Sequence, residues 1–167
     1  MTMSSKKSIM TDEEIYKEIK KYFKIQEFVS KRVYKKYGEG AWQFICPRLL
    51  HTLLIIREGL GKPITINNWH NGGKFSQRGL RSNMGTIFYS KFKKGRMYLS
   101  AHIMGRAVDF DVKGMTAPEV RDWLEGFEKE LPYKIRLENK MKGKQISWVH
   151  LDMFYRAASP KVYRFNI

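Results

Sequence analysis

Three short segments in the C-terminal half of the chain alternate aliphatic residues with ionisable ones. They are residues 107–112, 133–138 and 146–153. Successive side chains of a β-strand point to opposite faces, so in each segment the aliphatic residues share one face. The opposite faces carry Asp109, Asp111, Arg136, Glu138, Trp148, His150 and Asp152. A solvated strand face would be expected to carry mainly Lys, Thr and Glu. Because these faces carry Trp, His and Asp together, we expect the three strands to form the floor of a polar cleft.

The first 60 residues carry three helical patterns. A capping box at residues 11–14 opens the first, apolar spacing predicts a second over residues 28–38, and a third runs over residues 47–58. Residues 1–10 have no such pattern, and we expect them to form a flexible tail. Residues 11–167 are then a single domain, which suits a chain of 167 residues.

The remaining elements mix helix and strand. A second capping box opens a helix over residues 116–131, and the turn at residues 139–144 joins two strands as an antiparallel hairpin. Short strands are predicted at residues 64–66 and 162–167. Residues 67–98 are predicted to form a long loop, of a length that is usually either functional or disordered. The sequence therefore predicts an α+β fold, with a small antiparallel sheet packed against the N-terminal helices and one later helix.

The chain is strongly basic, with 32 Lys and Arg against 16 Asp and Glu and a formal net charge of +16. Such a charge attracts polyanions: nucleic acid, anionic lipid or anionic cell-wall polymers. A nucleic-acid-binding protein is therefore a rival hypothesis, although the common nucleic-acid-binding motifs are absent. The rival is not favoured, because runs of charge usually form a solvated face.

The sequence has neither a run typical of a membrane span nor one typical of a signal peptide. No apolar run approaches the roughly 20 residues of a membrane span, so no span is expected. The chain begins without an apolar stretch of the signal-peptide kind, which predicts synthesis in the cytoplasm without a signal peptide. The single cysteine, Cys46, allows no internal disulfide.

Three residues are suitable metal ligands. His102, Asp109 and His150 would supply two imidazole nitrogens and one carboxylate oxygen. Catalytic zinc commonly has three protein ligands and one open position for water. The residue pattern alone leaves open whether these three side chains meet in space.

Two segments carry a family resemblance. Residues 100–109 match the pattern S-x-H-x-x-G-x-A-x-D, and residues 148–152 match W-x-H-x-D. Together they resemble the zinc D-alanyl-D-alanine carboxypeptidase and L-alanyl-D-glutamate endopeptidase family, in its VanY-like branch. That family shares its fold with the sonic hedgehog signalling domain. The resemblance covers about residues 62–155 and is only loose over the first 60 residues.

The resemblance implies one zinc ion per chain, held by His102, Asp109 and His150. Ser100 would hydrogen-bond a ligand histidine, and Gly105 would let the chain turn closely past the metal. The implied activity is that of a zinc metallopeptidase, a carboxypeptidase or an endopeptidase, acting on peptidoglycan stem peptides. We expect a monomer.

The cellular context follows from the same resemblance. A wall-directed enzyme without an export signal suggests a phage or prophage lysin that degrades the cell wall after release or delivery. Anionic cell-wall polymers are then the expected partners of the basic surface.

One position departs from the family pattern. Many members carry a catalytic carboxylate three residues before the last histidine ligand, where this chain has Ser147. Glu138, across the expected hairpin, and Asp152, two residues beyond His150, are the candidate replacements. Glu138 could instead pair with Arg136, and Asp152 could orient a ligand. A zinc-bearing binding module without catalysis therefore stays an alternative.

Substrate contacts are the last expectation. The resemblance implies an arginine upstream of the first histidine that holds the substrate carboxylate or carbonyl. Arg78 and Arg81 are the candidates, since a guanidinium suits carboxylate recognition, and a flexible basic loop is the alternative. Trp148, on the polar face beside His150, is the third predicted contact.

Overall fold

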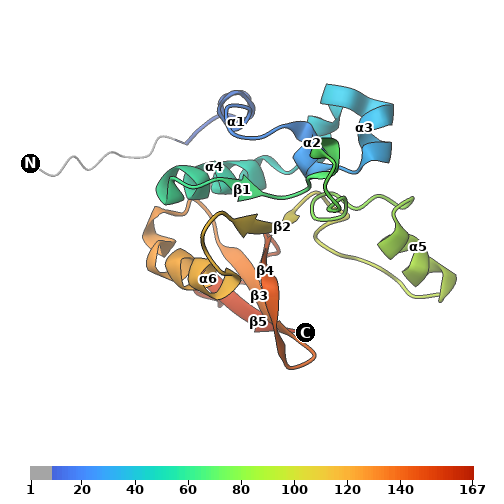
Figure 1. Ribbon diagram of the computed structural model, residues 1–167. Helices are drawn as coiled ribbons and strands as arrows, with labels where there is room; N and C mark the ends of the chain where they lie inside the picture. The colour runs from blue at the N-terminus through green and yellow to red at the C-terminus, as the bar shows by residue number, and fades with distance from the viewer. Residues whose placement is uncertain (1–8) are drawn as a thin grey trace, which may run out of the picture.

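The computed structural model describes residues 9–167 (Figure 1), so residues 1–8 of the expected tail lie outside the described residues. The α-helices are α1 (Asp12–Ile19), α2 (Ile25–Phe28), α3 (Lys31–Tyr37), α4 (Pro47–Leu60), α5 (Thr86–Lys93) and α6 (Ala117–Gly126). Short 3-10 helices are η1 (Gly38–Phe44), η2 (Trp69–Asn71) and η3 (Glu128–Glu130). The strands are β1 (Ile64–Thr65), β2 (Ala107–Val112), β3 (Ile135–Met141), β4 (Lys144–Asp152) and β5 (Val162–Asn166).

Local signals begin and end the helices as the sequence predicts. The Thr11 side chain accepts a hydrogen bond from the Glu14 backbone, and the Glu14 carboxylate accepts one from the Thr11 backbone at 2.8 Å. The same capping box opens α6, and α4 ends at Gly61 in the left-handed conformation (φ 61°). The predicted second helix is interrupted, because Ser30 caps a new helix by accepting from the Val33 backbone.

The α+β class is confirmed, and the sheet is mixed, with the strand order β1-β2-β4-β3-β5. Strand β4 pairs antiparallel with both β2 and β3, as expected for the hairpin. Strand β5 pairs parallel with β3, so the expectation of a purely antiparallel sheet is corrected. The crossover before β5 is held beside β3 by Lys134, whose Nζ donates to the carbonyls of Ala157 and Ser159 at 3.0 Å each. No local sequence signal encodes this long-range contact.

The aliphatic faces of the strands form the core. Phe110, Leu137 and Leu151 are fully buried, one from each of the three alternating segments. They belong to one continuous cluster that also includes Leu50 of α4 and Leu124 of α6. The ionisable residues are therefore left on the other face of β2, β3 and β4. None of the helices within residues 9–167 is both long and apolar enough to span a membrane.

The predicted loop over residues 67–98 contains η2 and α5, and part of it is packed tightly beside the sheet. Gly79 passes so close to Phe28 that a Cβ at this position would lie 2.1 Å from the Phe28 carbonyl oxygen. The Asp109 backbone nitrogen donates to the Arg78 carbonyl at 2.7 Å. Residues 78–81 are thus held beside β2.

Candidate metal centre

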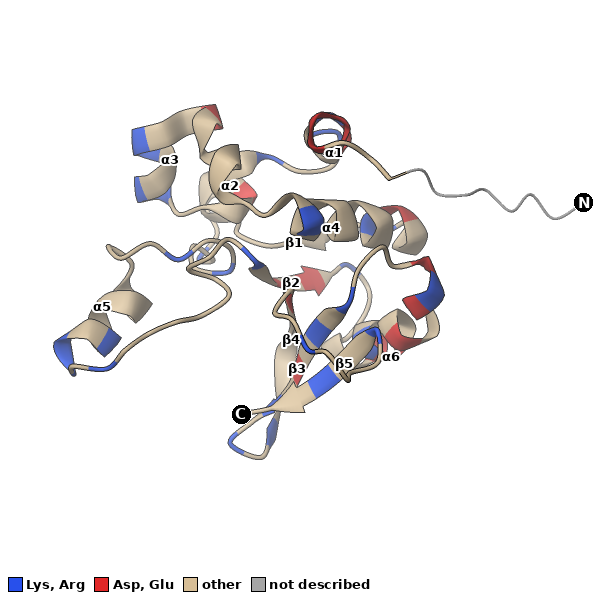
Figure 2. Ribbon diagram, turned by 180° about the vertical axis from the view of Figure 1, so that it is seen from behind, with Lys and Arg blue, Asp and Glu red and all other residues tan. Residues whose placement is uncertain are grey.

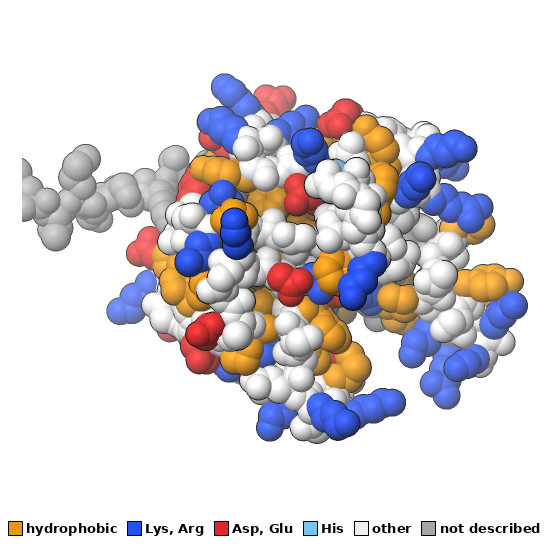
Figure 3. Space-filling view, viewed as in Figure 1, with side chains coloured by type: hydrophobic (Ala, Val, Ile, Leu, Met, Phe, Trp, Pro, Cys, Tyr) orange, Lys and Arg blue, Asp and Glu red, His pale blue; other side chains and the backbone are white. Residues whose placement is uncertain are grey.

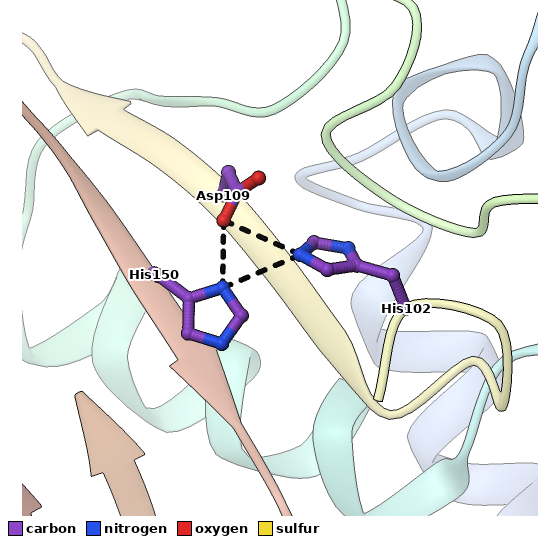
Figure 4. A group of neighbouring side chains, drawn as sticks. All are labelled: His102, Asp109 and His150. Carbon is purple, nitrogen blue, oxygen red and sulfur yellow. Dashed lines mark hydrogen bonds and ion pairs between the residues drawn. The ribbon is translucent and has the colours of Figure 1, made fainter. Parts of the chain in front are cut away.

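The structure brings the three predicted ligands together (Figure 4). His102 lies in the turn before β2, Asp109 lies on β2 and His150 lies on β4. The ligand atoms all lie within 4.8 Å of one another. The three residues expose 2%, 6% and 9% of their surface, respectively. They form a buried group that can hold a metal ion.

Strand pairing and a tight turn place these side chains. Asp109 and His150 are directly opposed Cα partners in the β2–β4 ladder. His102 precedes Gly105, which has a φ of 63° and at which a Cβ would lie 1.9 Å from the Phe44 carbonyl oxygen. A glycine is therefore required here by the left-handed turn and by the closeness of the Phe44 backbone, and the expectation that this turn passes the metal stays a prediction.

Each histidine is oriented by a hydrogen bond on the nitrogen that faces away from the ligand group. The His102 Nδ1 donates to the Gly79 carbonyl at 2.8 Å, which directs its Nε2 toward His150. The His150 Nε2 donates to Asp152 Oδ2 at 3.0 Å, which leaves Nδ1 facing Asp109. Such partners fix the tautomer and the ring orientation of metal-binding histidines.

Ser100 supports the turn and not the imidazole. Its Oγ accepts a hydrogen bond from the His102 backbone nitrogen at 3.1 Å. The expected contact from Ser100 to the histidine ring is replaced by the contact from the Gly79 carbonyl. The backbone geometry explains this, since the Ser100 hydroxyl lies within reach of the amide two residues later.

Asp152 is a positioning residue by its geometry. Its two oxygens accept from Arg136 Nε at 2.8 Å and Nη2 at 2.9 Å, and Oδ1 also accepts from the Phe154 backbone at 2.9 Å. With the bond from His150, both oxygens are fully engaged, and the residue is 1% exposed. The role of ligand orienter, one of the two considered for Asp152, fits this arrangement, whereas that of general base does not.

Arg81 holds the aspartate ligand. Its Nη2 donates to Asp109 Oδ2 at 3.0 Å, Nη1 donates to the Tyr98 hydroxyl at 2.9 Å, and Nε donates to the Gln77 carbonyl at 2.9 Å. This leaves Asp109 Oδ1 as the oxygen that faces both histidines. Arg81 is therefore held inside the site, where it contacts Asp109, and its role as a substrate contact stays a prediction.

The other two predicted substrate residues lie nearby. Arg78 pairs with Asp111 and stacks over the Phe75 ring, with 3.5 Å from its guanidinium carbon to the ring centroid. Trp148 is half-buried on β4, and its carbonyl accepts from Arg121 Nη1 at 3.1 Å. Arg78 and Trp148 stay predictions as substrate contacts.

The pKa shifts of the three residues indicate which of them carries a proton. Burial raises the pKa of Asp109, but the adjacent imidazoles of His102 and His150 outweigh it and hold the pKa well below the usual range. Burial lowers the pKa of His150, but its bonds to Asp109 and Asp152 outweigh it and raise the pKa to about 9. Burial lowers the pKa of His102. The site thus combines ionised Asp109, neutral His102 and protonated His150.

Glu138 is a buried carboxyl beside this group. It is the direct Cα partner of His150 in the β3–β4 ladder and is 5% exposed. Its Oε1 is buried without a hydrogen-bond partner, so the considered pairing with Arg136, which binds Asp152, is not formed. Burial raises the pKa of Glu138. Perturbed carboxyls of this kind mark candidate functional sites.

Ser147 and His51 lie outside the ligand group. Ser147 is exposed and lines a cavity with Phe110 and Val149, whose lining contains none of the ligands. His51 is buried on α4 and faces the ring of Tyr133 at 5.8 Å between centroids. The ligand group is nearly closed, since its three residues each expose less than a tenth of their surface.

Arg136, Gly79 and Tyr98 have supporting roles in the site that the sequence did not predict. Arg136 lies on the predicted polar face, so its alternation with Ile135 and Leu137 could have indicated that it faces the site. Gly79 acts through a backbone carbonyl, and Tyr98 acts through Arg81, and neither role has a sequence signature.

Comparisons with models of protein families, with curated proteins and with solved structures find no match for this chain. The family resemblance of its two motifs stays a hypothesis. Function must be inferred from the site itself.

Proposed function

We propose that the chain is a zinc-dependent hydrolase that cleaves an amide bond in peptidoglycan stem peptides. The observation that carries the proposal is a buried His-Asp-His group beside Glu138, which lies directly across the strand pair from His150 and has a buried carboxyl oxygen without a hydrogen-bond partner. A hydrolytic site needs a metal-binding group and a nearby proton acceptor, and these residues supply both.

The donor set supports zinc. Two imidazole nitrogens and one carboxylate oxygen are a common catalytic zinc set, which keeps a fourth position open. The separations between the three ligand atoms are 2.8, 3.3 and 3.4 Å. Tetrahedral bonds of about 2.0–2.1 Å would separate two ligand atoms by roughly 3.3 Å. The side chains therefore need little movement to bind the ion.

Bound zinc would polarise the substrate carbonyl and lower the pKa of water toward about 7. Glu138 takes a proton from the water while the water oxygen attacks the carbonyl carbon. The carbon–nitrogen bond then breaks, and Glu138 returns the proton to the leaving amine nitrogen. Arg81 and Asp152 keep Asp109 and His150 oriented throughout.

The substrate class rests on the two motifs and the charge. The resemblance to VanY-like peptidases implies stem peptides that contain D-amino acids. The net charge of +16 favours approach to an anionic wall. A phage or prophage lysin fits this combination. Arg78 and Trp148 are the proposed substrate contacts.

A non-catalytic zinc-bearing module is the second candidate. The observation that favours it is the closure of the site, since His102, Asp109 and Glu138 each expose less than a tenth of their surface. A structural metal site is closed, whereas a catalytic site has to admit substrate.

Digestion of purified peptidoglycan separates the candidates. The zinc-loaded protein should release new amino and carboxyl termini from stem peptides, identified by mass spectrometry, and chelation should abolish the release. Zinc binding without any cleavage would support the non-catalytic module. Sequence-selective DNA binding at physiological salt, again without cleavage, would support the rival hypothesis.

A further inference from the structure

Residues 83–99 form an arm that stands away from the sheet (Figure 1). Its helix, α5, has eight residues, none of them buried. Isolated helices shorter than about 12 residues are marginal in water. The ring of Phe88 contacts those of Phe92 and Tyr98 at centroid distances of 6.4 and 6.1 Å. The arm therefore has little apolar support from the rest of the protein.

Large apolar side chains are concentrated on the arm. Among the described residues, five of the twelve large hydrophobics classed as exposed lie on it. They are Met97 (87% exposed), Leu99 (68%), Phe92 (66%), Met84 (55%) and Tyr89 (51%). Figure 3 shows apolar and basic side chains together on the protruding lobe at the right. Clustered exposed apolar surface marks an interaction site.

The charge of the arm has one sign. Its cations are Lys91, Lys93, Lys94 and Arg96. The chain has no Asp or Glu between Glu58 and Asp109, and Figure 2 shows only basic residues among the charged positions of α5. None of the four cations forms an ion pair with the described residues. An anionic occupant would therefore complement this surface.

The exposed apolar residues of the arm indicate which kind of anionic occupant fits best. A soluble polyanion would neutralise the lysines but leave Phe92, Met97 and Leu99 in water. The interface of an anionic bilayer accepts both, since cations contact the headgroups while apolar side chains enter the acyl boundary. We propose that the arm attaches the protein peripherally to anionic lipid surfaces. This inference is independent of the proposed hydrolytic function.

Vesicle co-sedimentation tests it with the full-length protein. The probes are vesicles of phosphatidylcholine alone and of phosphatidylcholine with about one-third phosphatidylglycerol. The wild type should bind the anionic vesicles and not the neutral ones. Three triple variants are compared: Phe92→Ser/Met97→Ser/Leu99→Ser, Lys91→Gln/Lys93→Gln/Lys94→Gln, and the matched control Lys140→Gln/Lys142→Gln/Lys144→Gln at the β3–β4 hairpin.

Both arm variants should lose binding. Removal of three lysines from the arm should weaken partition of the protein onto anionic vesicles on the order of a hundredfold, because each cation near the surface contributes about fivefold. The apolar triple, with its charge intact, should weaken it at least tenfold. The hairpin control should stay within about threefold, because those lysines lie on a different part of the surface. Circular dichroism and the melting temperature identify any variant that misfolds.

Three results would overturn the proposal. The first is a wild type that does not bind anionic vesicles. The second is a hairpin control that loses as much as the arm lysine variant, which would mean attraction by total charge. The third is normal vesicle binding by the Phe92→Ser/Met97→Ser/Leu99→Ser variant. If the arm also binds duplex DNA or dextran sulfate, this result would identify a polyanion site.

Discussion

Glu138 and His150 are directly opposed across the β3–β4 pair, and the Glu138 carboxyl has a buried oxygen without a hydrogen-bond partner. An ionisable group left in this state costs stability. A chain that needed only a packed sheet would be better served by an apolar residue at this position. The position therefore combines a stability cost with proximity to the metal-binding group, and this combination is typical of functional residues.

Zinc content tests the ligand set. The purified protein should carry about one zinc per chain, and His102→Ala or His150→Ala should abolish it, because two protein ligands rarely hold zinc. The matched control is His70→Ala, since His70 lies in η2 outside the ligand group. Elemental analysis after gel filtration gives the ratio. Full zinc retention in both ligand variants would refute the assignment.

Zinc binding should release a proton. In the metal-free protein, bonds to Asp109 and Asp152 overcome the effect of burial and raise the pKa of His150 to about 9. The proton must leave before Nδ1 can bind metal, so apparent affinity should rise about tenfold from pH 7 to pH 8. Calorimetry in two buffers of different ionisation enthalpy should give about one proton released at pH 7. Release of none would contradict the prediction.

The same raised pKa affects the stability of the metal-free fold. The folded-state pKa of His150 lies above its unfolded value, so protonation stabilises the fold. This contribution is fully present below about pH 6.5 and is lost as the pH rises through about 9. The melting temperature of the chelated wild type should therefore fall over this range more than that of His150→Gln, measured by calorimetry. Equal declines would exclude His150 as the cause.

Glu138→Gln separates catalysis from metal binding. The amide preserves shape but cannot accept the proton of water, so stem-peptide hydrolysis should fall at least about a hundredfold while zinc is retained. Burial raises the pKa of this carboxyl, so the charged form is disfavoured in the folded state. The neutral variant should consequently melt slightly higher at neutral pH. Exposed Glu13→Gln is the control for both measurements, and an active Glu138→Gln enzyme would exclude Glu138 as the base.

Asp152→Asn should act through His150. The substitution weakens the acceptor that holds Nε2 and the paired bonds from Arg136. Loss of such outer contacts typically costs about 10–100-fold in metal affinity, and hydrolysis should fall with it. Competition with a fluorescent zinc chelator measures the affinity. An inactive variant with normal zinc affinity would instead give Asp152 the role proposed for Glu138.

Arg81→Met should weaken zinc binding by a similar factor of about 10–100, because Asp109 Oδ2 loses its partner. Tyr98→Phe removes only the hydroxyl that accepts from Arg81 and should have a smaller effect in the same direction. Arg78→Met is the matched control, since that side chain pairs with Asp111 and not with a ligand. Equal loss in Arg78→Met would point to general disturbance of the loop.

The sequence by itself determined the local features of this protein. Capping boxes at Thr11 and Thr116 begin their helices because the bonds join residues three apart. The period of two in residues 107–112 and 146–153 separated core side chains from ionisable ones, since alternation is a property of the strand backbone. Motif spacing also indicated His102, Asp109 and His150, which the structure places together.

The tertiary structure decided what depends on contacts between distant segments. The register of β3 on β4 places Glu138 opposite His150, and the packing of loop 78–81 on β2 turns Arg81 toward Asp109. The parallel entry of β5 and the burial of the ligand group likewise depend on the path of the chain through space. Periodicity and spacing describe neighbours along the chain, whereas register and loop packing are set by the energetics of the whole core.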